Sequence, residues 1–167
     1  MDWSTVGLMV GLGVVLSAST GLRAFVAPFI LACAGGLGWV QLSDQLSWLA
    51  TPLAIGALAI AIILEILADK VPLVDHAMDT AHLLVKPAAG ALASAALVDG
   101  SSPMMGWAAA LVGGGAVAGM THVAKAGLRV GSTSTTFGAG NPVISVVEDL
   151  IAVALGGGVV LGIHLMG

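Results

Sequence analysis

The sequence predicts an all-α protein, a polytopic bundle of about six membrane-spanning helices. Of its 167 residues, 58% are hydrophobic and only 8% are charged, and the mean hydropathy is +1.07. In a soluble domain about a quarter of the residues are charged, so lipid is the expected solvent for much of this chain. At about 20 residues per span, the length allows six or seven spans in a single domain, residues 1–167, and leaves no room for a second.

Six apolar stretches are expected to form the helices. They cover residues 5–20, 24–40, 48–68, 72–98, 103–124 and 142–166. The first two are short and meet at residues 19–23, with Pro28 soon after. Residues 5–40 therefore form either two spans or one broken, re-entrant pair.

The charges predict an orientation. Asp2, Asp44 and Asp99 fall in one set of loops, whereas Arg23, Lys70, Lys125 and Arg129 fall in or beside the other set. The positive-inside rule then places the cationic loops in the cytoplasm and both termini outside, in the inner (plasma) membrane of the cell. The four tryptophans, at positions 3, 39, 48 and 107, fall at the outer helix ends, where indoles prefer the interface.

Most of the remaining polar residues lie in the cytoplasmic half. Asp75, Asp79, His82 and Lys86 step by 4, 3 and 4 residues, which places them on one helical face. Charge inside a bilayer costs at least a few kcal/mol, so such residues should face the bundle interior and pair. The candidate ligand-binding or pore-lining residues, which include five cations and six of the nine acids, are Arg23, Glu65, Asp69, Lys70, Asp75, Asp79, His82, Lys86, His122, Lys125, Arg129, Asn141, Ser145, Glu148 and Asp149.

Two interpretations fit these residues: they line a polar cavity open to the cytoplasm, or they form interhelical ion pairs that only fix the packing. Residues 131–140 are dense in glycine and hydroxyls and are expected to form a loop, followed by a helix start at Asn141-Pro142. Exposed amides, hydroxyls and guanidinium groups suit a small anion such as phosphate or carboxylate. A flexible polar linker is the alternative, and the segment lacks the Gly-Lys-Ser/Thr ending of a P-loop.

Metal binding and catalysis are less well supported. Glu65/Asp69 and Asp75/Asp79 are carboxylate pairs with a spacing that suits Mg²⁺, but ion pairing explains them equally well. No catalytic motif appears and no cofactor is expected, so an enzyme is less favoured than a non-enzyme. The net charge of −4 and the lack of a basic stripe argue against nucleic acid.

Three pairs of glycines are spaced four residues apart, as in helices that approach closely in lipid. They are Gly7/Gly11, Gly115/Gly119 and Gly158/Gly162. Close packing within one chain is favoured, and a homo-oligomer through these helix faces is the alternative.

Three segments together resemble a bacterial family of small membrane proteins called domain of unknown function 4126. The segments are residues 21–28, residues 65–92 with the run Glu-Ile-Leu-Ala-Asp-Lys-Val-Pro, and residues 122–149 with Gly-Asn-Pro. Many members are expected to carry Arg before the proline, where this chain has Lys86, which keeps the charge but lacks the bidentate fork. The resemblance implies a membrane location and no particular activity.

Three functions follow from the residues. The leading one is a small transporter, flippase or channel-like protein for a small anion, an ion or a phosphate-bearing lipid headgroup. The second is a membrane enzyme that uses a divalent metal on a phosphate-containing lipid. The third is a structural or assembly protein without a ligand.

Overall fold

The computed structural model describes residues 3–68, 72–97, 107–108 and 110–166. The described residues contain helices and no strand, which confirms the all-α prediction. The helices are α1 (Trp3–Leu22), α2 (Val26–Gly36), η1 (Asp44–Ala50), α3 (Pro52–Ala68), α4 (Pro72–Leu97), η2 (Ala110–Gly115), α6 (Ala116–Thr136) and α7 (Asn141–Met166). Of these, η1 is a 3₁₀ helix and η2 is a π-helix.

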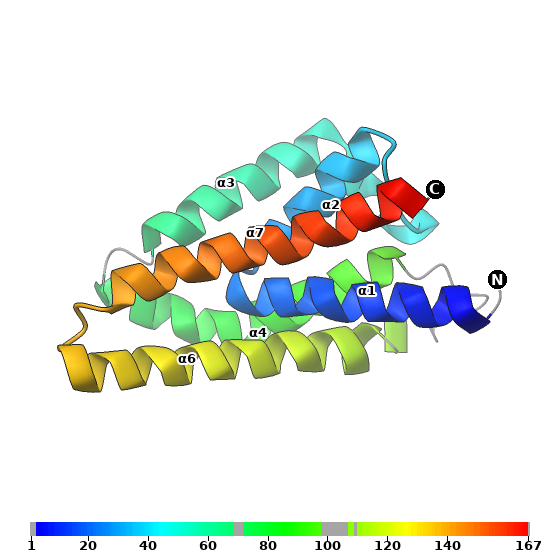
Figure 1. Ribbon diagram of the computed structural model, residues 1–167. Coiled ribbons are helices and arrows are strands. Elements are labelled where there is room, and N and C mark those ends of the chain that lie inside the picture. The colour runs from blue at the N-terminus through cyan, green and yellow to red at the C-terminus, as the bar shows by residue number, and fades with distance from the viewer. Residues whose placement is uncertain (1–2, 69–71, 98–106, 109, 167) are drawn as a thin grey trace.

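The long helices alternate in direction along the chain. α1, α3 and α6 run one way, α2, α4 and α7 run the other way, and the two ends of the chain lie at the same end of the bundle (Figure 1). α1 is central, because it contacts α2, α4, α6 and α7. Helices therefore occur in the order that the apolar stretches predict, whereas their passage through a membrane stays a prediction.

Small residues bring α1, α4 and η2 close together. Ser17 Oγ lies 2.8 Å from Ser94 Oγ, and Ser94 Oγ donates to the Gly13 carbonyl at 3.0 Å. A Cβ on Gly90 would lie only 2.7 Å from the Gly114 carbonyl oxygen, so these backbones can touch only because both positions are glycine. Small residues and interhelical hydrogen bonds are typical of helix contacts in lipid.

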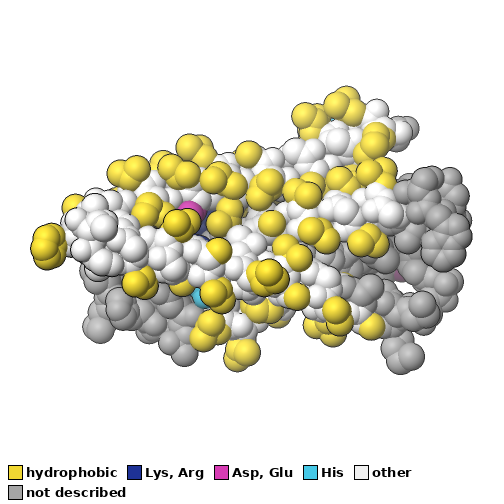
Figure 2. All heavy atoms as spheres, turned by 60° about the horizontal axis from the view of Figure 1, so that its bottom comes forward, with side chains coloured by type: hydrophobic (Ala, Val, Ile, Leu, Met, Phe, Trp, Pro, Cys, Tyr) yellow, Lys and Arg dark blue, Asp and Glu magenta, His cyan; other side chains and the backbone are white. Residues whose placement is uncertain are grey.

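The apolar core is built from α2, η1, the last part of α4 and α7, together with Leu16 of α1. Leu16, Leu31, Leu46 and Leu49 are almost completely buried there. Bulky apolar side chains elsewhere face outward, as Leu53 does with 84% of its surface exposed. Figure 2 shows hydrophobic side chains spread over one face, with charged groups visible only in small spots.

By length and composition, α7 is the one helix of the described residues that could cross a membrane. The pair η1 and α3, bent by 69°, passes the same test when the two are counted as one span. The other apolar helices are shorter; they are Gly7–Leu22, Val26–Gly36 and Ala81–Leu97.

The expectation of a loop over residues 131–140 was wrong for its first half. α6 continues to Thr136, and its hydroxyl side chains stabilise it locally. Thr133 Oγ1 donates to the Arg129 carbonyl and Thr135 Oγ1 to the Gly131 carbonyl, each at 2.9 Å. Such bonds to the preceding turn let Ser and Thr remain helical, and the turn comes only at Phe137 and Gly138, where φ is positive.

The junction between α1 and α2 lies inside the bundle. Arg23 is 1% exposed and Ala24 is fully buried. Arg23 reaches Ser145, four residues after the start of α7, which at 1.5 Å per residue is about 6 Å along that helix. The turn between α1 and α2 is therefore buried by the rest of the protein, and the choice between two spans and one broken pair stays a prediction.

Candidate functional site

The site is built around the carboxyl end of α1. Lys86 Nζ, from α4, donates to the Leu22 carbonyl at 3.2 Å, and Lys125 Nζ, from α6, donates to the same oxygen at 3.1 Å. Both lysines are at least 96% buried. The last carbonyls of a helix have no intrahelical partner and carry partial negative charge, so the two ammonium groups complete the end of α1.

A carboxylate binds the connection between α1 and α2. Glu65, from α3, accepts a hydrogen bond from the Ala24 backbone N–H at 2.9 Å through Oε1. Ala24 precedes Phe25, the N-cap residue of α2, so this bond fixes the connection and does not cap the helix. Side chains from α3, α4 and α6 thus hold the break, with cations at the end of α1 and an anion on the connection that follows it.

Acidic groups of α7 face the cations. Glu148 Oε2 lies 3.0 Å from Lys125 Nζ and 3.2 Å from the Arg129 guanidinium. Arg23 Nε pairs with Asp149, and Arg23 Nη2 donates to Ser145 Oγ at 2.8 Å. Because α7 begins at Asn141, these acids lie inside the bundle rather than at its end.

Two histidines connect Glu65 to the lysines. His82 Nε2 lies 3.8 Å from Glu65 Oε1, and the His82 and His122 rings meet edge to face with centroids 6.2 Å apart. Lys86 Nζ donates to His122 Nδ1 at 3.2 Å. Ionisable groups of α3, α4 and α6 therefore lie near one another, and of these three contacts the one between Lys86 and His122 is a hydrogen bond.

We call this set the charged cluster; its members are Arg23, Glu65, His82, Lys86, His122, Lys125, Arg129, Ser145, Glu148 and Asp149. Among these residues, four are cations and three are carboxylates. Two buried oxygens, Glu65 Oε2 and Glu148 Oε1, have no hydrogen-bond partner within the described part of the chain. The cluster is therefore not a fully satisfied polar network.

The remaining predicted residues lie either apart from the cluster or outside the part of the chain that the structure describes. Asn141 lies apart, where its Nδ2 donates to Thr133 Oγ1 at 3.1 Å, and it begins α7 instead of preceding it. Asp69 and Lys70 lie outside the described residues. Asp75 and Asp79 belong to α4, and their side chains are also outside what the structure describes.

One essential member of the site is a backbone group that residue patterns do not reveal. The Leu22 carbonyl becomes a shared acceptor only because α1 ends deep in the bundle. The predicted break at residues 19–23 was the signal that could have revealed this group. A helix that ends inside the protein leaves its last carbonyls without intrahelical partners, so cationic side chains are expected beside them. The hydroxyls of residues 133–135, expected to face a ligand, bond to α6 carbonyls instead.

Within the described residues, no group of three His, Cys, Asp or Glu side chains could hold a metal. The carboxylate pairs proposed for Mg²⁺ include Asp69, Asp75 and Asp79, whose side chains lie outside that part.

The glycine pairs behave differently from one another. A Cβ on Gly119 would lie 3.6 Å from Pro87 Cγ, and one on Gly115 would lie 3.2 Å from the Pro87 carbonyl oxygen, so this pair packs within the chain. Added Cβ atoms at both members of the other pairs, Gly7/Gly11 and Gly158/Gly162, would meet no atom within 4 Å. Close packing within one chain is therefore confirmed for the central pair, and the structure does not show it for the other two.

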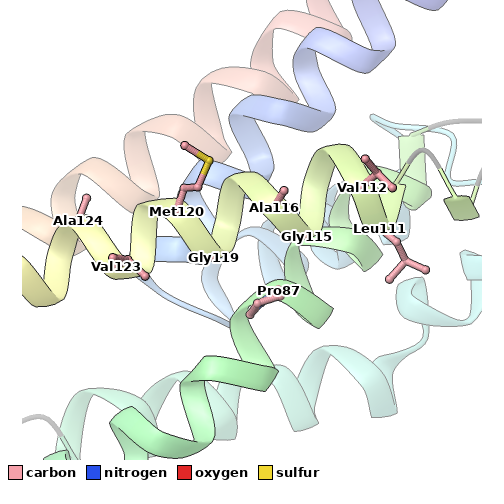
Figure 3. Close-up of a pocket in the computed structure, with 9 residues that line it drawn as sticks. All are labelled: Pro87, Leu111, Val112, Gly115, Ala116, Gly119, Met120, Val123 and Ala124. Atoms are coloured by element: carbon pink, nitrogen blue, oxygen red, sulfur yellow. The ribbon is translucent and has the colours of Figure 1, made fainter.

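An apolar groove of about 900 Å³ lies between α4 and the η2–α6 segment. Pro87, Gly119, Met120 and Val123 line it together with residues of η2 (Figure 3). No lining residue belongs to the charged cluster, so the groove does not open a path to the cations through its described walls.

Comparison with known proteins places the chain in a family. No curated protein and no solved structure matches it. The family model described as Domain of unknown function (DUF4126) matches residues 10–165. The match covers nearly the whole sequence, and the protein therefore belongs to the DUF4126 family.

Proposed function

We propose that this protein is a small multi-pass transporter of the bacterial inner membrane, and that the charged cluster binds a phosphate-bearing anion. The observation that carries the proposal is the convergence of Lys86 and Lys125 on the Leu22 carbonyl at a buried helix break. Helix pairs interrupted inside the bundle form the substrate sites of many secondary transporters. There, helix ends and charged side chains meet at one point, as they do here.

Several features support a membrane location. The chain is 8% charged, its helices alternate in direction (Figure 1), and exposed leucines and valines cover much of the described surface. A water-facing monomer rarely exposes such large apolar areas. The proposed orientation keeps both termini outside and the charged cluster in the cytoplasmic half.

The energetic balance favours a site over a packing device. Removing charged groups from water costs several kcal/mol each, and well-packed apolar residues stabilise a fold equally well. A structural network would also satisfy all its members, whereas Glu65 Oε2 and Glu148 Oε1 lack partners among the described residues. The cluster is thus expected to lower the stability of the fold, and a binding function would explain why the protein keeps it.

The cluster suits an anion because two of its cations, Lys125 and Arg129, contact the same carboxylate oxygen of Glu148. An incoming phosphate would exchange with Glu148 as the partner of Lys125 and Arg129, which now lie 3.0 and 3.2 Å from Glu148 Oε2. Arg23, held by Asp149 and Ser145, would provide a planar pair of donors. Arg23, Lys125 and Glu148 are buried, whereas Arg129, Ser145 and Asp149 are partly exposed, so access to the buried cations requires a rearrangement of the groups around them.

A ligand panel tests this function. Thermal unfolding of the purified protein in detergent is measured with inorganic phosphate, pyrophosphate, carboxylates, Mg²⁺, Zn²⁺ and a polyprenyl phosphate. A ligand at 100 times its Kd stabilises the folded state by about 2.7 kcal/mol. We expect a rise with one or more phosphate compounds, and loss of that rise in Arg23→Ala.

Ser94→Ala is the matched control, because Ser94 is buried and hydrogen-bonded but lies outside the charged cluster. It should keep the response to phosphate even if its melting temperature falls. A rise with Mg²⁺ alone would favour the membrane enzyme. No rise with any ligand, together with a large loss of stability in Arg23→Ala, would mean that the cluster is structural.

A further inference from the structure

Helix α3 is attached to the bundle in an unusual way. Of its 17 residues, Pro52–Ala68, only Glu65 and Ala68 are buried. Its first half rests on the apolar core through Ile55 and Leu58, which are partly buried. In its second half, the buried side chains are those of Glu65 and Ala68, so a carboxylate is one of the groups that hold this part of the helix.

Glu65 is placed differently from the other buried glutamate. Glu148 lies within 3.2 Å of two cations. Within the described residues, Glu65 forms no ion pair with a lysine or an arginine; its Oε1 accepts the Ala24 N–H and lies 3.8 Å from His82 Nε2, and its Oε2 has no partner. Glu65 is thus a buried carboxylate that shares its surroundings with an imidazole.

We propose that Glu65 and His82 form a proton-binding site, and that protonation of Glu65 releases the second half of α3 from the α1–α2 junction. The ionised carboxylate accepts a charge-assisted hydrogen bond, which is about twice as strong as a neutral one. Protonation therefore weakens the bond that holds Ala24 to α3. Buried Asp, Glu and His chains carry protons in membrane pumps and transporters.

The proton-binding site lies next to the proposed anion site. Its role rests on the proposed transporter function, in which the proton would be the coupling ion. His122 and Lys86 extend the line of groups from His82 to the Leu22 carbonyl. Movement of a proton along Glu65 and His82 would thus alter the electrostatics beside the cations that bind the anion.

Other charged groups also face Glu65. Arg23 from the junction, Lys86 from α4 and Lys125 from α6 act on it electrostatically from longer range. α2 carries no charged residue, and Asp44 of η1 is exposed and lies towards the opposite end of α3. The side chains of Asp75 and Asp79 lie outside the described residues.

The structure also provides a hinge for the movement. η1 and α3 meet at Thr51 and Pro52 with a bend of 69°, and the first half of α3 is anchored by apolar contacts. Loss of the Glu65 contact would free the far end of α3 to swing about this point. The swing would uncover the charged cluster from the α3 side.

The experiment measures the movement directly. In a Cys33→Ser background, spin labels at Leu64 on α3 and Val153 on α7, both exposed, report their separation by pulsed electron paramagnetic resonance in lipid nanodiscs. A second pair, at Met120 on α6 and Val153, reports a part of the bundle that should stay fixed. Spectra are compared in mildly alkaline and mildly acidic buffer.

We expect acid to shift the α3–α7 distances to longer values and to leave the α6–α7 distances unchanged. Glu65→Gln, which keeps the size but cannot ionise, should show the long distances in both buffers. Ser94→Ala, at a buried and hydrogen-bonded position outside the charged cluster, is the control and should keep the response to pH. Unchanged α3–α7 distances in the wild-type pair, or a shift that persists in Glu65→Gln, would overturn the proposal.

No ligand is needed, so this result is separate from the test of the transporter. A pH-dependent movement without any response to phosphate would leave the proton site standing and reject the anion site. A response to phosphate without the movement would do the reverse. The wild-type measurement decides the matter even if Glu65→Gln fails to fold.

Discussion

The contact between Lys125 and Glu148 gives the sharpest quantitative prediction. Lys125 Nζ and Glu148 Oε2 are 3.0 Å apart, and the two side chains are 4% and 6% exposed. At an effective dielectric constant of about 20, Coulomb's law gives an attraction of about 5 kcal/mol at this distance. Removal of one partner leaves an uncompensated buried charge, which typically costs about 3–5 kcal/mol.

We expect the lower end of that range for each single variant, because each remaining charge keeps a second contact. In Lys125→Met, Glu148 retains Arg129 at 3.2 Å. In Glu148→Gln, Lys125 retains the Leu22 carbonyl at 3.1 Å. Each should lose about 3 kcal/mol, and the double variant should lose less than the sum by about 1–3 kcal/mol, as coupled neighbours do.

The assay is reversible unfolding in detergent, with wild type, both single variants and the double variant under the same conditions. A coupling energy near zero would mean that the two groups do not stabilise one another. Single losses well below about 1 kcal/mol would mean that the cluster is open to water, as surface ion pairs are. Either result would refute the view that these charges are buried and mutually dependent.

Two further predictions concern packing and orientation. Gly90→Ala places a Cβ 2.6 Å from Ala118 Cβ, and the overpacking should lower the free energy of unfolding by about 1–3 kcal/mol. Gly158→Ala is the control, because its Cβ would meet no atom within 4 Å, and it should not lower the stability. Equal unfolding midpoints for the two variants would contradict the close contact at Gly90. In the Cys33→Ser background, single cysteines at positions 43 and 133 should react with an impermeant thiol reagent from opposite sides of the membrane, and labelling from one side would reject the six-pass orientation.

Sequence patterns predicted the positions of the helices where breakers and apolar runs coincide. The stretch 72–98 corresponds to Pro72–Leu97 and the stretch 142–166 to Asn141–Met166, because proline marks the start of each helix. The end of α6 was missed for a local reason. Glycine and hydroxyl residues usually indicate a loop, but here the hydroxyls bond to the carbonyls one turn earlier and extend the helix.

The membership of the charged cluster could be predicted in outline, since charge in an apolar chain must turn inward and pair. The choice of partners could not. Arg23 pairs with Asp149, and Glu65 binds a backbone N–H, because the depth of each helix end is set by tertiary packing. The spacing of residues along one helix shows which of them share a face. It does not show where along that helix a neighbouring helix ends.

The buried break between α1 and α2 has a consequence for biosynthesis. The partners of the Leu22 carbonyl are 64 and 103 residues further along the chain. At about 5–20 residues per second, the second of them follows Leu22 out of the ribosome about 5–20 s later. Until then the first helix pair holds an uncompleted helix end, so it cannot reach its final form as an independent hairpin. The first helix pair of this protein therefore depends on residues made much later, and it completes its fold only after Lys125 has been synthesised.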